Sequence, residues 1–270
     1  PSFRGAGKER VTVRHLLTHS SGLRADWPLW RVTPNADSAL KLVNAISLDT
    51  APAVRMVYSD LGAILLGEVV ERVLGGRLDR LASRRIFQPL GMTSTRFRPP
   101  AGWLWRVAAT EYDTVWRKRI VRGQVHDEKA AWLGGVAGHA GLFGSVQDLL
   151  TFGEWMLRTT GDAGVTTIPT ERTSLSAAAR EFVRRQNLVP GSSRALGWDT
   201  PSPGSSAGTL LSQQSFGHTG FTGTSLWIDP ERQLVIVLLT NRVHPTRANT
   251  RIGPLRIAVA DAVIRALEGR

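Results

Sequence analysis

The sequence predicts a mixed fold, α/β or α+β, in which a large helical section precedes an antiparallel sheet. Apolar residues recur at helical spacing through the first half of the chain, whereas the last third has the short apolar runs and turn signals of strands. Helices first and strands afterwards are typical of such architectures. The composition, 42% hydrophobic and 21% charged over 270 residues, is that of a globular protein with one large domain or two small ones.

The strongest predicted helix covers residues 59–74, and Gly75-Gly76 ends it. Its apolar residues lie three or four positions apart and so share one face: Leu61, Ile64, Leu65, Val69 and Val73. A first helix over residues 11–19 is capped by Thr12, and a capping box of Ser145 and Asp148 begins another over 146–158. Further helices are predicted over residues 35–44, 78–86 and 253–267.

Three strands are predicted after the helices, over residues 215–218, 224–228 and 234–240, with a hairpin turn at 229–232. Residues 99–144 are predicted to be mostly loop. The segment 190–208 is rich in Ser, Gly and Pro and is the best internal boundary. It divides a mainly helical subdomain, residues 25–190, from the sheet strands and last helix, residues 191–270.

The composition excludes several function classes. Without cysteine, the chain has no disulfide, no thiolate nucleophile and no Cys-ligated zinc. The net charge of +12 does not predict nucleic-acid binding, because 30 of the 34 basic residues are dispersed arginines and no nucleic-acid motif accompanies them. The longest apolar run, residues 234–239, is too short to span a membrane. No signal-peptide pattern precedes the first helix, and we expect the chain to be a fragment or trimmed.

Familiar motifs for hydrolases, metals and cofactors fail on context. The match to G-x-S-x-G at residues 204–208 lies in a flexible loop, without the strand before it and helix after it that a nucleophile elbow needs. His15 and His19 are four residues apart on a helix, but the Glu of a zincin is missing. The glycines of residues 138–144 have the wrong spacing for a dinucleotide loop. We therefore predict no cofactor and no metal.

Two triplets remain as candidates for a site. Tyr58-Ser59-Asp60 stands at the start of the strongest helix, where cations and the helix dipole can hold a tyrosine as phenolate. His218-Thr219-Gly220 ends a strand and precedes Phe221, and such a strand end lets an acyl carbonyl accept a backbone N–H bond. Each triplet alone is also compatible with a plain helix cap or strand end.

The sequence around these triplets resembles the penicillin-recognising serine hydrolases, a family of class C β-lactamases, DD-carboxypeptidases and related esterases. The resemblance covers nearly the whole chain and rests on residues 11–23 (VTVRHLLTHSSGL), Tyr58-Ser59-Asp60-Leu61-Gly62, Pro89-Leu90-Gly91-Met92 and residues 216–223 (FGHTGFTG). Residues 125–130 (VHDEKA), 134–143 (GGVAGHAGLF) and 241–247 (NRVHPTR) are similar to a narrower, penicillin-binding protein 4B-like subgroup.

This resemblance implies a fold and a mechanism. The fold is an antiparallel sheet flanked by helices beside an all-helical subdomain, so residues 1–270 form a single domain that lacks its N-terminal part. In the mechanism, a serine attacks an amide or ester carbonyl, and water hydrolyses the acyl-enzyme.

The family's nucleophile motif, Ser-x-x-Lys, is missing from its expected place ahead of residues 11–23. Only ten residues precede Val11, and none of them forms the motif. The match Ser38-Ala39-Leu40-Lys41 falls after that block and is interpreted as a chance occurrence. We therefore expect the nucleophile and its lysine to lie upstream of Pro1.

The resemblance also implies roles for the two triplets. Tyr58 relays protons, and Asp60 stands where the family often has an Asn that binds the substrate amide and the catalytic lysine. His218 replaces the Lys of a Lys-Thr-Gly motif, Thr219 binds a substrate carboxylate beside Gly220, and Phe221 supplies an oxyanion-hole N–H. The family gives no role to four neighbouring residues, for which loop-stabilising hydrogen bonds are favoured over a place at the cleft edge: His126, Asp127, Glu128 and His139.

Three functions compete at this stage. The first is a serine hydrolase acting on D-alanyl peptides, β-lactams or small esters, with a small-molecule or peptidoglycan-peptide substrate. The second is a catalytically inactive relative that binds cell-wall-type ligands. A basic nucleic-acid-binding module is a distant third. The resemblance implies a periplasmic or other extracytoplasmic location.

Overall fold

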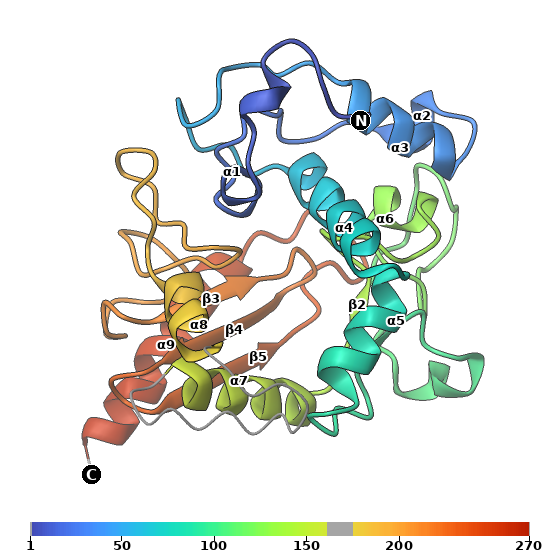
Figure 1. Cartoon of the computed structure of the whole chain (residues 1–270). Coiled ribbons are helices and arrows are strands. Elements are labelled where there is room, and N and C mark those ends of the chain that lie inside the picture. The colour runs from blue at the N-terminus through green and yellow to red at the C-terminus, as the bar shows by residue number, and fades with distance from the viewer. Residues whose placement is uncertain (1, 161–174, 270) are drawn as a thin grey trace.

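A three-stranded antiparallel sheet forms the C-terminal part of the protein, with helices beside and above it (Figure 1). The computed structural model describes residues 2–160 and 175–269. The strands are β1 (Arg96–Phe97), β2 (Leu142–Phe143), β3 (Phe216–Thr219), β4 (Thr224–Asp229) and β5 (Leu234–Leu239). The α-helices are α1 (Val13–Leu17), α2 (Leu29–Val32), α3 (Ala36–Ala45), α4 (Asp60–Leu74), α5 (Leu78–Ala82), α6 (Glu128–Trp132), α7 (Val146–Thr160), α8 (Leu175–Val183) and α9 (Ile252–Glu268). Short helices of other types are η1 (Lys8–Arg10), η2 (Ser83–Phe87) and η3 (Ala101–Arg106).

Helices cover both faces of the sheet formed by β3, β4 and β5. Phe216 and Ile228 lie opposite each other in the register and pack against α7. Trp227 and Ile236 pair in the same way on the other face and pack against α9. Because successive strand residues point to opposite faces, this alternation places one helix on each side. The predicted α/β (α+β) class, an antiparallel sheet flanked by helices, is confirmed.

A helical layer stands beside the sheet and has a core of its own, to which α1, α2, α3 and α4 contribute (Figure 1). Its longest helix, α4, begins where the sequence predicts. The Ser59 side chain caps it by accepting the N–H of Gly62 at 3.1 Å. Gly75 ends it in the left-handed region at φ 64°, a conformation that glycine adopts without a steric penalty. This cap fixes the orientation of the residues just before the helix, which include Tyr58.

Residues 99–144 are mostly loop, as predicted, with the short elements η3, α6 and β2 inside them, the last paired with β1. With only five residues, α6 is too short to show a helical period in the sequence. One prediction about local structure needs correction, at the capping box of α7. At the start of α7, Ser145 Oγ accepts the Asp148 N–H as expected. The Asp148 carboxylate, however, accepts bonds from Ser94 N and Thr95 Oγ1, both at 2.8 Å.

The segment 190–208, which the sequence marks as a boundary, follows the edge of the sheet. Asp199 and Gly217 exchange two backbone hydrogen bonds of 2.8 and 2.9 Å. Helix α7 lies within residues 25–190, yet it packs against β4 and β5. The two predicted parts of the chain therefore share the sheet and its core, and the division at residue 190 stays a prediction. Across residues 2–160 and 175–269, no helix has the length and hydropathy of a membrane-spanning segment.

Candidate active site

Tyr58 lies immediately before the cap of α4 and is held there by bonds to the neighbouring residue. The Ser59 N–H donates to His19 Nδ1 at 3.1 Å, and Ser59 Oγ donates to the Arg24 carbonyl at 2.7 Å. These bonds join the start of α4 to the turn that follows α1. Tyr58 is 44% exposed, so the fixed ring remains open to solvent on one side.

The tertiary structure brings the two sequence triplets together. The ring of Tyr58 lies 4.3 Å from the ring of His19 and 5.9 Å from that of His218, measured between centroids. The guanidinium of Arg194 lies over the Tyr58 ring at 5.2 Å, and its Nη1 is 3.4 Å from His218 Nε2. Sequence analysis did not single out Arg194, because nothing in its local sequence indicates this position. His19, interpreted as structural, proves to be a neighbour of Tyr58.

Burial sets the protonation of these rings. It lowers the pKa of His19 to about 3, with help from the charges of Arg194 and His218. Burial and the charge of Arg194 also lower the pKa of His218, so both imidazoles are neutral at neutral pH. Burial, and then the charge of Asp60, raise the pKa of Tyr58. Within the described residues, burial and Asp60 outweigh Arg194, which favours the protonated phenol, and a phenolate held by cations stays a prediction.

The end of β3 is fixed by backbone and side-chain hydrogen bonds. The Gly220 N–H donates to the carbonyl of Thr224 at 2.8 Å. The carbonyls of Gly220 and Thr224 each accept a 2.7 Å bond from Arg256 Nη2. His218 Nδ1 donates to the carbonyl of Thr219 at 3.0 Å, which turns its Nε2 towards Arg194.

Phe221 is held from two sides although its side chain is 59% exposed. Its ring stacks on His126, with 5.6 Å between centroids and an angle of 18°, and Arg242 lies over it at 4.1 Å. Arg242 Nε also donates to the Phe221 carbonyl at 2.7 Å. His126 is itself buried and bonded through Nε2 to Glu111 at 2.9 Å. These contacts fix the backbone that carries the Phe221 N–H.

Asp60 belongs to an ion-pair network that the sequence did not predict. The Lys129 ammonium lies 3.0 Å from Asp26 Oδ1 and 3.1 Å from both Asp60 Oδ2 and Asp127 Oδ2. Burial opposes the charge on Lys129, but the carboxylates of Asp127, Asp60 and Asp26 together outweigh it and raise the pKa of Lys129. The signal in the sequence was the Asp-Glu-Lys run within residues 125–130, which the sequence analysis used as a mark of the narrower subgroup without giving Lys129 a role.

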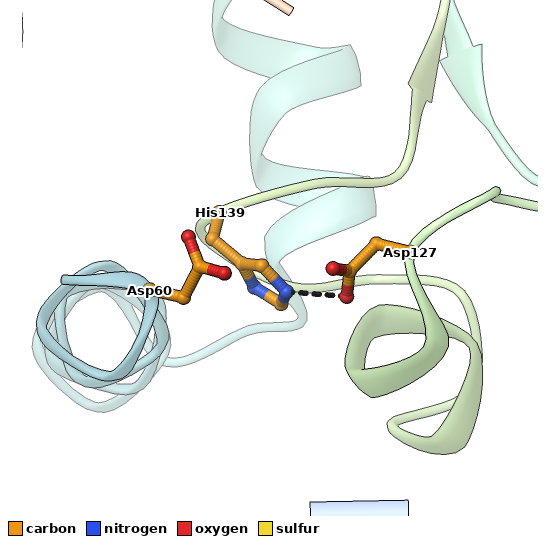
Figure 2. A group of neighbouring side chains, drawn as sticks. All are labelled: Asp60, Asp127 and His139. Atoms are coloured by element: carbon orange, nitrogen blue, oxygen red, sulfur yellow. Dashed lines mark hydrogen bonds and ion pairs between the residues drawn. The ribbon is translucent and has the colours of Figure 1, made fainter. Parts of the chain in front are cut away.

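His139 lies between Asp60 and Asp127, and Figure 2 shows its ring bonded to the latter. Its Nε2 is 2.7 Å from Asp127 Oδ1. Ligand atoms of these three residues lie within 4.8 Å of one another, a spacing that can suit a metal ion. Lys129, however, already contacts both carboxylates, so an ammonium supplies the positive charge that a metal would bring. Together with a 2.6 Å pair between Glu128 and Arg247, these bonds agree with the loop-stabilising interpretation of residues 126–128 and 139.

A glycine lets this loop approach α4. A Cβ added at Gly138 would overlap with the carbonyl oxygen of Ala63 in α4. We expect Gly138→Ala to destabilise the protein by about 1–3 kcal/mol, because α4 and the loop must separate. Chemical denaturation measures this change. Gly253→Ala, in α9 with open space around it, is the control and should stay within about 1 kcal/mol of the parent. Equal effects at both positions would contradict the close approach.

Comparisons with known proteins agree on one family. The family model described as Beta-lactamase matches residues 1–261. A protein of Escherichia coli K12, provisionally named D-alanyl-D-alanine carboxypeptidase, is 33% identical over 273 residues, which cover 92% of this chain and 61% of that protein. A Salmonella typhi protein with the same name is 31% identical over 277 residues, covering 94% and 62%. This chain thus spans somewhat less than two thirds of these relatives.

Solved structures give the same fold. A class C beta-lactamase matches with a TM-score of 0.71 at 18% identity, covering 97% of this chain and 72% of that one. A beta-lactamase/D-alanine carboxypeptidase from Pseudomonas syringae matches with a TM-score of 0.68 at 21% identity, covering 96% and 74%. At these identities the likeness concerns the arrangement of helices and strands.

Proposed function

This chain belongs to the β-lactamase family, and from that premise we propose that it is the larger part of a serine carboxypeptidase that removes a terminal D-alanine from peptides. The substrates would be cell-wall-type peptides in the periplasm or another extracytoplasmic compartment. The serine and its lysine would come from residues that precede Pro1, as the family pattern implies.

One observation carries this proposal: the guanidinium of Arg194 is the positive charge beside Tyr58 and His218. Because His218 is neutral, it cannot replace the charge of the lysine that the family motif has at this place. Arg194 lies 3.4 Å from His218 Nε2, and its Nε is buried without a hydrogen-bond partner in the described part of the chain. Arginine binds carboxylates through paired N–H bonds, so the site suits a substrate that ends in a carboxylate next to Thr219.

The residues can be ordered along an acyl-transfer reaction. As the proposed upstream lysine takes the proton of the serine hydroxyl, the serine oxygen bonds to the carbonyl carbon of the scissile peptide, and the Phe221 N–H stabilises the oxyanion. The carbon–nitrogen bond then breaks, Tyr58 passes its proton to the leaving amine of D-alanine, and the lysine returns the serine proton to the Tyr58 oxygen. A raised pKa suits this step, since the phenol keeps its proton at neutral pH. Water finally hydrolyses the acyl-enzyme and frees the shortened peptide.

The proposal predicts a substrate-dependent effect of Arg194, in the protein extended by its upstream coding sequence. Arg194→Met should raise KM for release of D-alanine from a D-alanyl-D-alanine peptide by about tenfold or more, because a charged hydrogen bond to the carboxylate is lost. Hydrolysis of neutral p-nitrophenyl acetate should change little. Arg184→Met is the matched control, since Arg184 is exposed and pairs with Glu181. An equal loss on both substrates would contradict a role in carboxylate binding.

The second candidate is a catalytically inactive relative that binds cell-wall-type ligands. It predicts that the extended protein binds the peptide, as measured by calorimetry, and releases no D-alanine. Release of D-alanine at more than the uncatalysed rate excludes it.

A further inference from the structure

One buried ammonium, that of Lys129, forms ion pairs with three carboxylates beside the proposed site. The Lys129 side chain is 8% exposed, and its Nζ lies 3.0–3.1 Å from oxygens of Asp26, Asp60 and Asp127. A charge that is removed from water is unfavourable unless an opposite charge compensates it, so the ammonium and the three carboxylates stabilise one another. The loss of the ammonium would leave neighbouring like charges without compensation.

Lys129 is held in place independently of Asp60. Asp127 caps α6 by accepting the Ala130 N–H at 2.7 Å, and the same carboxylate accepts a bond from His139. Ala130 is fully buried in the small core that α6 shares with the loop after it. The position of the ammonium is therefore fixed by α6, and it contacts Asp60, the first residue of α4.

Asp60 is the carboxylate that connects Lys129 to the reaction. It lies two residues after Tyr58 and begins α4, and its charge acts on the Tyr58 phenol. Asp26 is different, because its side chain is 62% exposed and lies at the surface side of the ammonium. Lys129 thus pairs with one carboxylate in the proposed site, Asp60, and with one at the solvent-exposed surface, Asp26.

We propose that Lys129 is a positioning residue of the proposed hydrolase, which anchors Asp60 through Oδ2 and compensates its charge. Without this ammonium, the negative charge of Asp60 acts uncompensated on Tyr58 and on the oxyanion that forms nearby. The proposal rests on the proposed function for its kinetic test. The groups that face Asp60 are Tyr58 from its own segment, Asp26, Lys129 and Asp127 from the neighbouring segments, and His139 from the loop after α6.

The test is a set of double variants in the extended protein, read as the acylation rate by a fluorescent penicillin. Lys129→Met should lower this rate by about ten- to a hundredfold at pH 7, the range that coupled neighbours show. Adding Asp60→Asn should restore most of the loss, because the amide needs no counter-ion. Adding Asp26→Asn instead should restore little, although it removes the same charge from the same lysine. Lys129→Arg keeps the charge and should stay close to the parent.

A purely structural lysine would give a different pattern. Asp60→Asn and Asp26→Asn would then rescue Lys129→Met equally or not at all, and that result would overturn the proposal. Thermal unfolding of each variant shows whether a loss of rate reflects a loss of fold.

A second readout does not need catalysis. In the 270-residue chain carrying Tyr112→Phe, Tyr58 is the remaining tyrosine, and its phenolate absorbance can be followed as the pH rises. Lys129→Met should raise the pKa of Tyr58 further, because the charge of Asp60 then acts on the phenol uncompensated, while Lys129→Arg leaves it unchanged. An unmoved titration would also overturn the proposal. If the parent itself is not acylated, the proposed function fails, and the titration still decides whether Lys129 controls the charge of Asp60.

Discussion

We expect the 270-residue chain to form no covalent adduct with a fluorescent penicillin, whereas a version extended by its upstream coding sequence becomes acylated stoichiometrically. The physical reason is that acylation needs a nucleophile activated by a base. Tyr58, His218 and Thr219 belong to the candidate site, but the one Ser-x-x-Lys match in the 270 residues, at 38–41, lies in α3. Intact-mass measurement after labelling distinguishes a chain that carries one adduct from a chain that carries none.

Acylation of the 270-residue chain itself would contradict this expectation, and Ser38 would then be the first residue to test. The structure argues against Ser38-Ala39-Leu40-Lys41 as the nucleophile motif. It lies in α3, in the helical layer, and Lys41 is exposed to solvent.

Tyr58→Phe should lower the acylation rate of the extended protein by about a hundredfold or more, the loss typical of a positioned proton-transfer group. Substrate affinity should change little, because the phenol oxygen acts mainly in the transition state. Stopped-flow measurement of acylation separates the two effects. The pKa of Tyr58 is raised, so the phenol is protonated through neutral pH in the parent, and only its hydroxyl is lost in the variant.

The chain contains a matched control for this variant. Tyr112 is the other tyrosine of the sequence and is similarly exposed, at 47% against 44%. Its backbone pairs with Ile120, whereas the neighbours of the Tyr58 ring are His19, His218 and Arg194. Tyr112→Phe should leave acylation unchanged. Wild-type kinetics in Tyr58→Phe would remove Tyr58 from the mechanism.

Asp60 shows how the structure changes an expectation from the family pattern. From the sequence, a carboxylate in place of Asn would act on an upstream lysine. In the structure, its Oδ2 already contacts Lys129 at 3.1 Å. The charge that Asp60 presents to a second lysine is thereby reduced, so Asp60 and Lys129 have to be considered as one unit.

Sequence reasoning succeeded where the determining interactions are local. The start and end of α4 follow from Ser59 and Gly75, each within a few residues of the groups it satisfies. The hairpin of β4 and β5 follows from two short, strand-like apolar segments on the two sides of a turn. It failed at α6, whose five residues are too few for a period, and at the Asp148 carboxylate, whose partners lie far back in the chain.

The sequence by itself determined the order of elements and the antiparallel sheet with its helices, and it supplied the two triplets that we propose as the site. Only the tertiary structure decided which charges surround those triplets. Arg194 beside Tyr58 and Lys129 beside Asp60 are contacts between residues far apart in the chain, and no spacing rule encodes them. Burial likewise exists only after folding. It keeps His19 and His218 neutral and Tyr58 protonated, because a charge removed from water is unfavourable unless a partner compensates it.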